Sequence, residues 1–545
     1  MTLFDMFAVA ARDHGSRPWL AVMPDTAELY AIAPGEITYQ AAFEAVLGLR
    51  ARYAAAGYGA GHRVGLLLEN RPDVFLHWYA LNALGASIVP LNPDLRAIEL
   101  AYVIAHSEVA AIVAIPARHA ALREAAGERR VKLFAPGDAP VPVAPEAAVA
   151  RDEAVLLYTS GTTGQPKGCV IDDAYLLNCG RWYAELGGLA AMRDGVERML
   201  TPLPLFHMNA LVTSATAMLR VGGCLIPLDR FHPRSWWRTV RESRATIIHM
   251  LGIMPAILMN DPPGPSDRDH AVRFAFGPGV DTTLHAPFEA RFGLPVIDAW
   301  AMTETGSGAV IAANEEPRHV GTNCFGRPPR EVETRIVRED GSDVAAGEPG
   351  ELLVRRAGPD PRFGFFREYL KDPDATAEAW AGGWFHTGDV VRRAPAGSFH
   401  FVDRRKNVIR RSGENVAAVE VEATLRQHPA VANVAVAPVA DALRGEEVFA
   451  CIVPALPSPN PLPEGEGLSL PLPPGEGRGE GLAQEIAAWC VKRLAYYKAP
   501  GFVAFVTELP LTSTQKVQRA ELRALAASLL AAGRAHDTRA LKRRG

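Results

Sequence analysis

Apolar and polar positions in the first 300 residues follow two alternating spacings. The short apolar run Arg63–Leu68 is typical of a buried strand, and the stretch Asp73–Leu84 after it has helical spacing. The same pattern predicts a helix over Thr38–Ala56 and strands over Ala86–Leu91 and Val109–Ile115, and it resumes from 154 to 300. Strands that alternate with helices form parallel sheets covered by helices. The pattern therefore predicts an α/β fold.

The pattern changes twice in the second half of the chain. After about 325, short alternating segments such as Val332–Val337 and Glu351–Arg355 indicate antiparallel, barrel-like strands. After about 403, a small α+β unit is expected. Its predicted helices are Ala418–Gln427, Ala483–Tyr496 and Arg519–Leu530, and its predicted strands are Val431–Val436, Val448–Val453 and Phe502–Val506.

Length and charge narrow the class of protein. A chain of 545 residues holds about three to four domain-sized units. Its 48% hydrophobic and 22% charged residues exclude a mostly disordered chain, and a net charge of −4 gives no general case for binding nucleic acid. Segment 455–482 has four Glu and one Arg, so it carries −3 of that −4. The segment also repeats PLPEGEG as PLPPGEG, which predicts an extended insertion outside any core.

Cysteine spacing and the N-terminus suggest where the protein works. The six Cys are at least ten residues apart, which excludes CxxC-type metal or redox motifs and a disulfide scaffold. The N-terminus has Asp5 where a signal peptide would have basic residues. No apolar run reaches the ~18 residues that span a membrane. We expect a cytoplasmic protein with no membrane span.

The strongest chemical motif is YTSGTTGQPKG at 158–168, directly after an apolar run. Three Gly and four Ser or Thr residues make a loop whose N–H and O–H groups can surround phosphate oxygens. Lys167 adds a positive charge. The loop is not a Walker motif, because Gly-Lys-Ser/Thr does not occur in the chain.

This string resembles the phosphate loop of the adenylate-forming enzymes. That superfamily includes acyl- and aryl-CoA synthetases, nonribosomal-peptide adenylation domains and firefly luciferase. The resemblance extends over nearly the whole chain, because further motifs of the family follow in order. It implies that ATP phosphates are contacted by Thr159, Ser160, Gly161, Thr162, Thr163, Gly164 and Lys167.

The segment Ala299–Thr305 resembles the family's aromatic-Gly-x-Thr-Glu motif. The resemblance implies that Trp300 stacks on adenine, Thr303 contacts the α-phosphate and Glu304 holds Mg²⁺. An indole face suits a purine, and a carboxylate suits a hard cation that bridges phosphates. Ala301 replaces the usual Gly, which requires a negative φ at this position.

Two segments resemble the family's nucleotide and acyl pocket. Phe276–Val280 includes Gly277, Pro278 and Gly279, whose small side chains allow the backbone to approach a ligand. Pro204–Asn209 resembles the segment that gates the acyl pocket, and His207 within it is a candidate catalytic residue. Amino-acid-activating members place an Asp near this point to pair with the substrate ammonium. Its absence here favours a carboxylic acid without an α-amino group.

The C-terminal part resembles the family in four further places. The box Trp384–Asp389 implies that Asp389 binds the ribose hydroxyls, and Arg404 is implied to reach the same ribose. Lys406 takes the hinge position about which the small domain rotates. Gly413 lies in the loop that approaches coenzyme A. Lys516, in PLTSTQKVQR at 510–519, is implied to bridge the carboxylate and the α-phosphate during adenylation.

The resemblance implies both a fold and a reaction. An N-terminal domain over 1–402 would contain two doubly wound sheets and a small β-barrel. A mobile α+β domain over 403–545 would carry Lys516 and the insertion. The expected activity is an ATP-dependent carboxylic acid–CoA ligase with ATP, Mg²⁺ and coenzyme A, most similar to bacterial carnitine/crotonobetaine-CoA ligases. The expected partners are a small carboxylic acid, ATP and CoA, without nucleic acid, and a homodimer stays open.

Three alternatives remain open from the sequence. The acyl group could pass to a carrier-protein phosphopantetheine instead of CoA, although no carrier domain is fused to the chain. The chain could be a non-catalytic nucleotide-binding relative, against which Lys167, Glu304, Asp389 and Lys516 all argue. A luciferase-like oxidation would share the same motifs.

Overall fold

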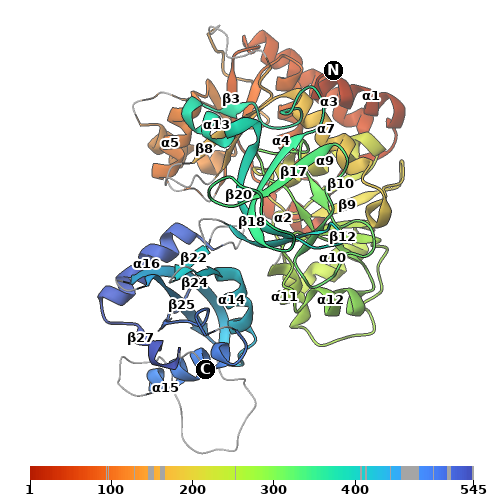
Figure 1. The fold of residues 1–545 in the computed structure, drawn as a ribbon. Helices are drawn as coiled ribbons and strands as arrows, with labels where there is room; N and C mark the ends of the chain where they lie inside the picture. The colour runs from red at the N-terminus through yellow and green to blue at the C-terminus, as the bar shows by residue number, and fades with distance from the viewer. Residues whose placement is uncertain are drawn as a thin grey trace, which may run out of the picture. The chain divides into compact units, whose positions relative to one another are not determined.

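The computed structural model divides into two compact units, shown as a ribbon in Figure 1. Unit 1 comprises Met1–Val337, Leu353–Thr387 and Arg393–His400, and unit 2 comprises Arg338–Leu352, Gly388–Arg392 and Phe401–Gly545. The structure describes the chain except residues 94, 96, 128, 130, 145–151, 160–165, 252, 405–407, 412–413, 442–443, 456–477, 495, 512–516 and 543–545.

The predicted alternation of helices and strands in the N-terminal region is confirmed, with bounds that differ by a few residues. Helix α3 (Tyr39–Ala55) begins where Thr38 accepts a hydrogen bond from the Ala41 N–H, 3.1 Å from the hydroxyl oxygen. This side chain caps an N–H group that the helix itself cannot bond. The next predicted helix is α4 (Asp73–Asn82), which lies in the chain between strands β3 (Arg63–Leu67) and β4 (Ser87–Pro90).

One seven-stranded sheet, sheet A, has the order β13-β12-β11-β9-β10-β1-β2. The strands from β13 to β1 pair in parallel, and β2 joins the edge antiparallel to β1. Their bounds are β1 (Pro18–Val22), β2 (Gly35–Thr38), β9 (Arg198–Thr201), β10 (Cys224–Pro227), β11 (Ile247–His249), β12 (Phe274–Phe276) and β13 (Val296–Ile297).

A second seven-stranded sheet, sheet B, has the order β19-β8-β7-β4-β3-β5-β6. Strands β7, β4, β3, β5 and β6 pair in parallel, whereas β8 and β19 extend the edge in antiparallel pairs. The strands not yet given bounds are β5 (Ala111–Ala114), β6 (Lys132–Phe134), β7 (Val155–Thr159), β8 (Lys167–Ile171) and β19 (Glu368–Tyr369).

Three apolar cores give unit 1 five layers. The central core joins the inner faces of both sheets to a layer of helices between them, α1 (Leu3–His14), α3, α4, α7 (Asp173–Ala184) and α9 (Thr213–Val221). A second core packs the outer face of sheet A on α10 (Trp236–Glu242), α11 (Ile253–Met259) and α12 (His285–Phe292). A third packs sheet B on α5 (Ala97–Ser107) and α6 (His119–Ala126). This arrangement confirms the two doubly wound sheets.

Smaller elements complete this part of the fold. The predicted barrel is a half-barrel sheet of order β16-β21-β20-β18-β17, whose strands contribute to both units. The remaining elements are α2 (Pro24–Tyr30), α8 (Met208–Leu211), β14 (Ala299–Trp300), β15 (Ile311–Ala312), β16 (Cys324–Gly326), β17 (Val332–Val337), β18 (Pro349–Arg356), α13 (Pro373–Ala379), β20 (Phe385–Arg393) and β21 (Phe399–Arg404). Helices α8 and α9 are separated at Val212, and Asn209 within α8 has a non-helical backbone.

Unit 2 confirms the α+β pattern of the C-terminal region. Its sheet runs β23-β22-β25-β26-β27, with β24 paired to β25. Helices α14 and α15 share one apolar core with the sheet, and α16 shares another. The bounds are β22 (Val408–Arg411), β23 (Glu414–Ala417), α14 (Ala418–Arg426), β24 (Val431–Asp441), β25 (Gly445–Pro454), α15 (Arg478–Val491), β26 (Phe502–Phe505), α16 (Arg519–Ala531) and β27 (His536–Asp537).

The predicted insertion over 455–482 overlaps helix α15 at its C-terminal end. Helix α15 begins at Arg478, so the last five residues of the predicted insertion are helical. Residues 456–477, which contain both Pro-Gly-Glu repeats, lie outside the described residues. Composition could not show where α15 begins. Residues 478–482 combine Arg and Glu, which favour a helix, with two Gly residues, which disfavour one.

Candidate active site

Strands β7 and β8, which flank the predicted phosphate loop in sequence, are neighbours in sheet B. Strands β7 and β8 pair antiparallel, and Thr159 lies opposite Lys167 at the open end of the pair. Residues 160–165, which hold the predicted phosphate ligands Ser160, Gly161, Thr162, Thr163 and Gly164, lie outside the described residues. The described ends of the hairpin therefore fix where the loop starts and stops.

Three residues distant in sequence meet beside this hairpin. The Lys167 ammonium lies 4.7 Å from the ring centroid of Tyr369, and its Nζ is 3.7 Å from Asp372 Oδ2. The Tyr369 hydroxyl donates a hydrogen bond to Glu304 Oε1 at 3.0 Å. Glu304 is buried, with 7% of its surface exposed. The predicted phosphate lysine and the predicted metal carboxylate thus contact the same tyrosine.

Thr303 is placed by a tyrosine of helix α7. The Tyr175 hydroxyl lies 2.8 Å from the Thr303 carbonyl oxygen and 2.8 Å from the Met208 sulfur. Met208 begins α8, and His207 precedes it as the N-cap residue. His207 is exposed, with its ring 4.7 Å from that of Phe206. One hydroxyl therefore joins the predicted α-phosphate segment to the predicted acyl gate.

Trp300 is buried in the edge strand β14. Only 5% of its surface is exposed, and its ring lies 6.3 Å from Phe325 with an interplanar angle of 36°. The next residue, Ala301, is not among the described residues with positive φ. The local backbone therefore accepts Ala where the family usually has Gly.

Asp298 is a site residue that sequence reasoning missed. Its Oδ1 accepts hydrogen bonds from the Gly279 N–H at 3.2 Å and from the Ala299 N–H at 2.9 Å. Burial raises the pKa of this carboxyl to about 6. The carboxyl therefore joins the Phe276–Val280 segment to the Trp300 strand. The available signal was an acidic residue directly after the apolar pair Val296–Ile297.

Gly279 has a left-handed backbone, with φ of 77°, which favours glycine at this position. Gly277, by contrast, lies at a closely packed position: a Cβ on it would be 3.0 Å from Val296 Cγ1, so the Val296 side chain would have to shift. Pro278 lies between them in the turn after β12. The two glycines thus serve different purposes in the same five-residue segment.

A buried polar relay lies behind the predicted acyl gate. Tyr183 hydroxyl and His249 Nε2 are 2.9 Å apart, His249 Nδ1 and Ser214 Oγ are 3.1 Å apart, and Ser214 donates to Asn209 Oδ1 at 2.6 Å. Burial lowers the pKa of His249 to about 3, so the imidazole is neutral. Since Ser214 has one proton, Nδ1–H must donate to Ser214, and Nε2 must accept from Tyr183. The relay fixes Asn209, the last residue of the gate segment.

Aromatic rings surround the start of the Phe276–Val280 segment. Phe276 lies 5.0 Å from Tyr183 and 6.3 Å from Trp182, measured between ring centroids, and the last two rings stack at 5.6 Å. A cavity of about 250 Å³ lies against Trp182. Its lining includes Ser307, three residues after Glu304, and three arginines: Arg181, Arg327 and Arg356.

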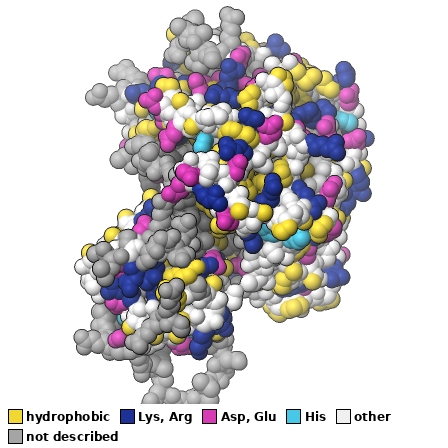
Figure 2. All heavy atoms as spheres, viewed as in Figure 1, with side chains coloured by type: hydrophobic (Ala, Val, Ile, Leu, Met, Phe, Trp, Pro, Cys, Tyr) yellow, Lys and Arg dark blue, Asp and Glu magenta, His cyan; other side chains and the backbone are white. Residues whose placement is uncertain are grey.

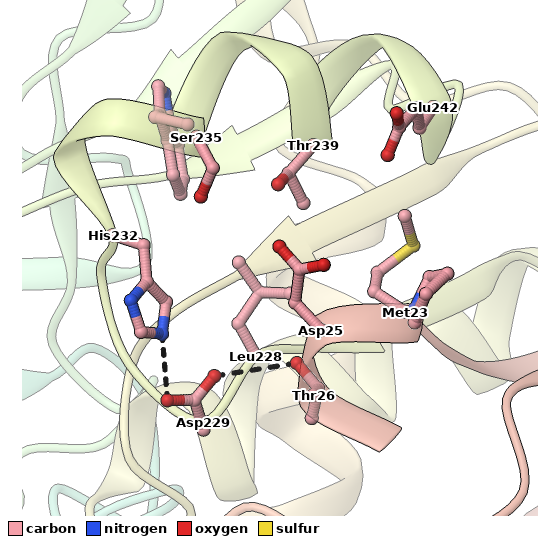
Figure 3. Close-up of a pocket in the computed structure, with 11 residues that line it drawn as sticks. Met23, Asp25, Thr26, Leu228, Asp229, His232, Ser235, Thr239 and Glu242 are labelled. Carbon is pink, nitrogen blue, oxygen red and sulfur yellow. Dashed lines mark hydrogen bonds and ion pairs between the residues drawn. The ribbon is translucent and has the colours of Figure 1, made fainter. Parts of the chain in front are cut away.

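Figure 3 shows a separate small pocket between α2 and α10. Its His232 Nε2 lies 2.8 Å from Asp229 Oδ2, and Thr26 donates to the other oxygen at 3.4 Å. The space is about 10 Å³, room for about one water molecule. None of the predicted site residues lines this pocket, so it is not the candidate active site.

Asp389 belongs to unit 2, within β20. It is buried, with 2% of its surface exposed. The preceding Gly388 has φ of 66°, and its N–H donates to Glu351 Oε1 at 3.1 Å. A non-glycine residue at 388 would be strained, so the glycine of the Thr-Gly-Asp box is required by the backbone.

The segment that carries Lys516 is closed at its base in unit 2. Leu511 and Val517 form an isolated antiparallel bridge, and the Gln518 N–H donates to the Pro510 carbonyl at 2.8 Å. Arg519 then makes a two-point ion pair with Glu422 of α14, at 2.6 and 3.1 Å. Lys516 itself, with residues 512–515, lies outside the described residues.

Three other predicted residues cannot be placed. Lys406 and Gly413 lie outside the described residues, as does the side chain of Arg404 at the end of β21. Their roles at the hinge, the CoA loop and the ribose stay predictions.

The Glu304 carboxylate suits a metal ion that binds together with the phosphates of a substrate. Among the residues that the structure describes, no group of three or more His, Cys, Asp or Glu side chains could hold a metal by itself. Mg²⁺ usually binds one or two carboxylates together with substrate phosphates. Glu304, buried and next to a lysine predicted to hold phosphates, fits that mode.

The surface and cysteines are consistent with the sequence. Figure 2 shows acidic and basic side chains interspersed over the visible face. All six cysteines are buried free thiols. Over the described part of the chain, no helix combines the length and apolar character needed to cross a membrane.

Comparison with known proteins places these residues in context. The family model "AMP-binding enzyme" matches residues 17–370, and the model "AMP-binding enzyme C-terminal domain" matches residues 420–516. A crotonobetaine/carnitine–CoA ligase of Citrobacter koseri is 30% identical over 86% of this chain and 90% of its own length. The ligase of the same name from Salmonella paratyphi A is also 30% identical, with the same coverage.

Solved structures share the fold. An o-succinylbenzoate CoA synthetase from Bacillus subtilis, in complex with its acyl-adenylate intermediate, superposes with a TM-score of 0.78 at 23% identity, over 95% of this chain and 97% of its own. ATP-bound MatB from Rhodopseudomonas palustris has a TM-score of 0.77 at 22% identity, over 96% of this chain and 99% of its own.

Proposed function

Since the chain belongs to the AMP-binding enzyme family, we propose that it is an ATP-dependent carboxylic acid–CoA ligase. In the first step, a carboxylate oxygen attacks the α-phosphorus of ATP, and pyrophosphate leaves to give acyl-AMP. In the second step, the thiol of CoA attacks the acyl carbon, and AMP leaves to give a thioester. Both steps depend mainly on positioning and charge neutralisation.

The observation that carries the proposal is the meeting of Lys167, Tyr369 and Glu304 beside the β7–β8 hairpin. Lys167 is suited to hold ATP phosphates, and Glu304 is suited to hold the Mg²⁺ that would neutralise them. A non-catalytic nucleotide-binding relative would bind ATP through the same residues, so acid-dependent pyrophosphate exchange is the measurement that separates it from the proposed enzyme.

The other assignments are part of the same proposal. Thr303 contacts the α-phosphate, Trp300 the adenine, Asp389 and Arg404 the ribose, and Gly413 the CoA. Lys516 bridges the carboxylate and the α-phosphate during adenylation. The division into domains 1–402 and 403–545, with rotation about Lys406 between the two steps, also belongs to the proposal, as does the cytoplasmic location.

The acid is the least constrained part, and we propose that betaine acids lead the candidates. The curated relatives are named for crotonobetaine and carnitine. Both acids carry a trimethylammonium group, which binds well to aromatic faces. The half-buried ring of Trp182, which lines the cavity of about 250 Å³, is a candidate for such a face. The absence of an Asp in the segment 204–209 is consistent with an acid that lacks an α-amino group.

The test is AMP release from ATP in the presence of CoA over a panel of carboxylic acids. The panel pairs each betaine acid with a neutral isostere in which carbon replaces the quaternary nitrogen. The proposal expects acid-dependent AMP, with a betaine acid preferred over its isostere. Acid-dependent pyrophosphate exchange without CoA-dependent AMP release would favour a carrier-protein acceptor. Oxygen uptake during turnover would favour the luciferase-like alternative.

A further inference from the structure

Tyr369 has no role in the sequence motifs, yet the fold brings it to the centre of the candidate site. It lies on the two-residue edge strand β19, which pairs antiparallel with β8. Tyr369 is directly opposite Cys169, and Lys167 is two residues from Cys169 on the same strand. Residues two apart in a strand point to the same face, so Tyr369 and Lys167 are diagonal neighbours on one face.

The Tyr369 segment holds Glu304 at two points. The Tyr369 hydroxyl donates to Glu304 Oε1 at 3.0 Å, and the Phe366 N–H donates to the Glu304 carbonyl oxygen at 2.9 Å. Burial raises the pKa of Tyr369, and the charge of Glu304 raises it further. The side chain and backbone of Glu304 are both fixed by residues 366–369.

The face of the same ring carries Lys167. The ammonium is 4.7 Å from the ring centroid, within the range of a cation–π interaction. Its ion pair with Asp372 is long, at 3.7 Å, and the other Asp372 oxygen caps helix α13 by accepting from the Ala375 N–H. The ring holds the ammonium without neutralising it. A direct Lys167–Glu304 ion pair would instead satisfy both charges and compete with phosphate and metal.

We propose that Tyr369 is a positioning residue for adenylation. It orients the Glu304 carboxylate with its hydroxyl and supports the Lys167 ammonium on its ring, which keeps the two charges at a set separation before ATP binds. This inference rests on the proposed function, because it takes Lys167 as a phosphate ligand and Glu304 as a metal ligand.

Replacement of Tyr369 by Phe tests the proposal, because it keeps the ring and removes the hydroxyl. Isothermal titration calorimetry, without acid or CoA, gives the Kd for a non-hydrolysable ATP analogue with Mg²⁺ and the Kd for AMP. The lost bond is charge-assisted, so we expect analogue binding to weaken about tenfold and to need more Mg²⁺. AMP has no β- or γ-phosphate, so its Kd should stay within about twofold.

A matched control is Tyr58→Phe. The Tyr58 hydroxyl also donates a partly buried hydrogen bond in unit 1, to the Val141 carbonyl at 2.9 Å, and among the described residues its partners include no predicted site residue. Tyr58→Phe should leave both Kd values unchanged. In a Glu304→Gln background, Tyr369→Phe should have no further effect on Mg²⁺-dependent binding, because the hydroxyl acts through the Glu304 carboxylate.

Two results for Tyr369→Phe would overturn the inference alone. If both Kd values rise equally, Tyr369 has a general structural role, and if neither changes, its hydroxyl positions nothing. Failure of the proposed function has a different signature. There, the unaltered protein would release no AMP from ATP with any acid of the panel and CoA, whatever the two Kd values of the variant, and the positioning role in adenylation would fall with it.

Discussion

Replacement of Asp298 by Asn should change how the stability of unit 1 depends on pH. Asp298 is 7% exposed, and its Oδ1 accepts from two backbone N–H groups that an Asn side chain can also satisfy. Burial raises the pKa of this carboxyl from 3.8 to about 6. Asn keeps the size and the acceptor but cannot ionise, so the variant isolates the cost of the buried charge.

The sign follows from the raised pKa. As pH rises from 4, the unfolded chain loses this proton before the folded protein does, so the folded protein becomes less stable. A difference of about two pKa units corresponds to about 3 kcal/mol, and most of it develops between pH 4 and pH 7. The variant lacks this loss. Its free energy of unfolding relative to the unaltered protein should therefore rise by about 2–3 kcal/mol over that interval.

Urea unfolding followed by tryptophan fluorescence measures this change. Eight of the nine Trp residues lie in unit 1, so the signal reports mainly on that unit. Asp267→Asn is the control, because the Arg291 guanidinium, 2.7 Å away, lowers the pKa of Asp267. Ionised Asp267 therefore stabilises the folded protein, and most of this stabilisation is already present at pH 4. The difference in free energy of unfolding between Asp267→Asn and the unaltered protein should stay nearly constant from pH 4 to pH 7. A pH-independent difference for Asp298→Asn would refute the reasoning that burial dominates this carboxyl.

Three predictions concern unit 2. Arg519→Gln removes the pair with Glu422 at the base of the Lys516 segment, so pyrophosphate exchange should fall about 100-fold, and an unchanged rate would contradict the anchor. Glu447→Gln leaves Arg411 and Lys542 buried without a carboxylate partner. Urea unfolding should show that the free energy of unfolding falls by about 3–5 kcal/mol, and a fall below about 1 kcal/mol would contradict the prediction. Replacement of residues 456–477 by a short Gly-Ser linker should leave both half-reactions unchanged, because loop length costs little closure entropy, and slower thioester formation alone would show that the insertion affects domain rotation.

Many helices and strands could be predicted because the spacing of apolar residues that defines them is local in the sequence. Strand β3 and helices α3 and α4 begin within a residue of the expected positions, since apolar periodicity and the Thr38 cap are both written in adjacent residues. The two-residue strand β19 could not be predicted. Its β pairing comes from β8, about 200 residues earlier, and a pair such as Glu368–Tyr369 has no periodicity of its own.

The candidate site divides in the same way. Lys167, Glu304 and Asp389 were located as candidates because the motifs around them resemble the family's phosphate, metal and ribose motifs. Asp298 and Tyr369 were missed, because each acts through burial and a contact across the fold. The pKa of Asp298 is raised only because neighbouring residues exclude water from its carboxyl. Tyr369 reaches Glu304 and Lys167 only because its strand pairs at the edge of sheet B. Neither condition is visible in a linear sequence.

The central claim is that the carboxylate attacks the α-phosphorus of ATP, and an isotope label tests it most directly. The preferred acid, labelled with ¹⁸O in its carboxylate, is turned over with ATP and CoA, and the nucleotide product is analysed by mass spectrometry. The attacking oxygen stays on phosphorus when the thiol displaces AMP, so the account predicts AMP that carries one ¹⁸O. Unlabelled AMP, or ADP with labelled inorganic phosphate, would contradict it.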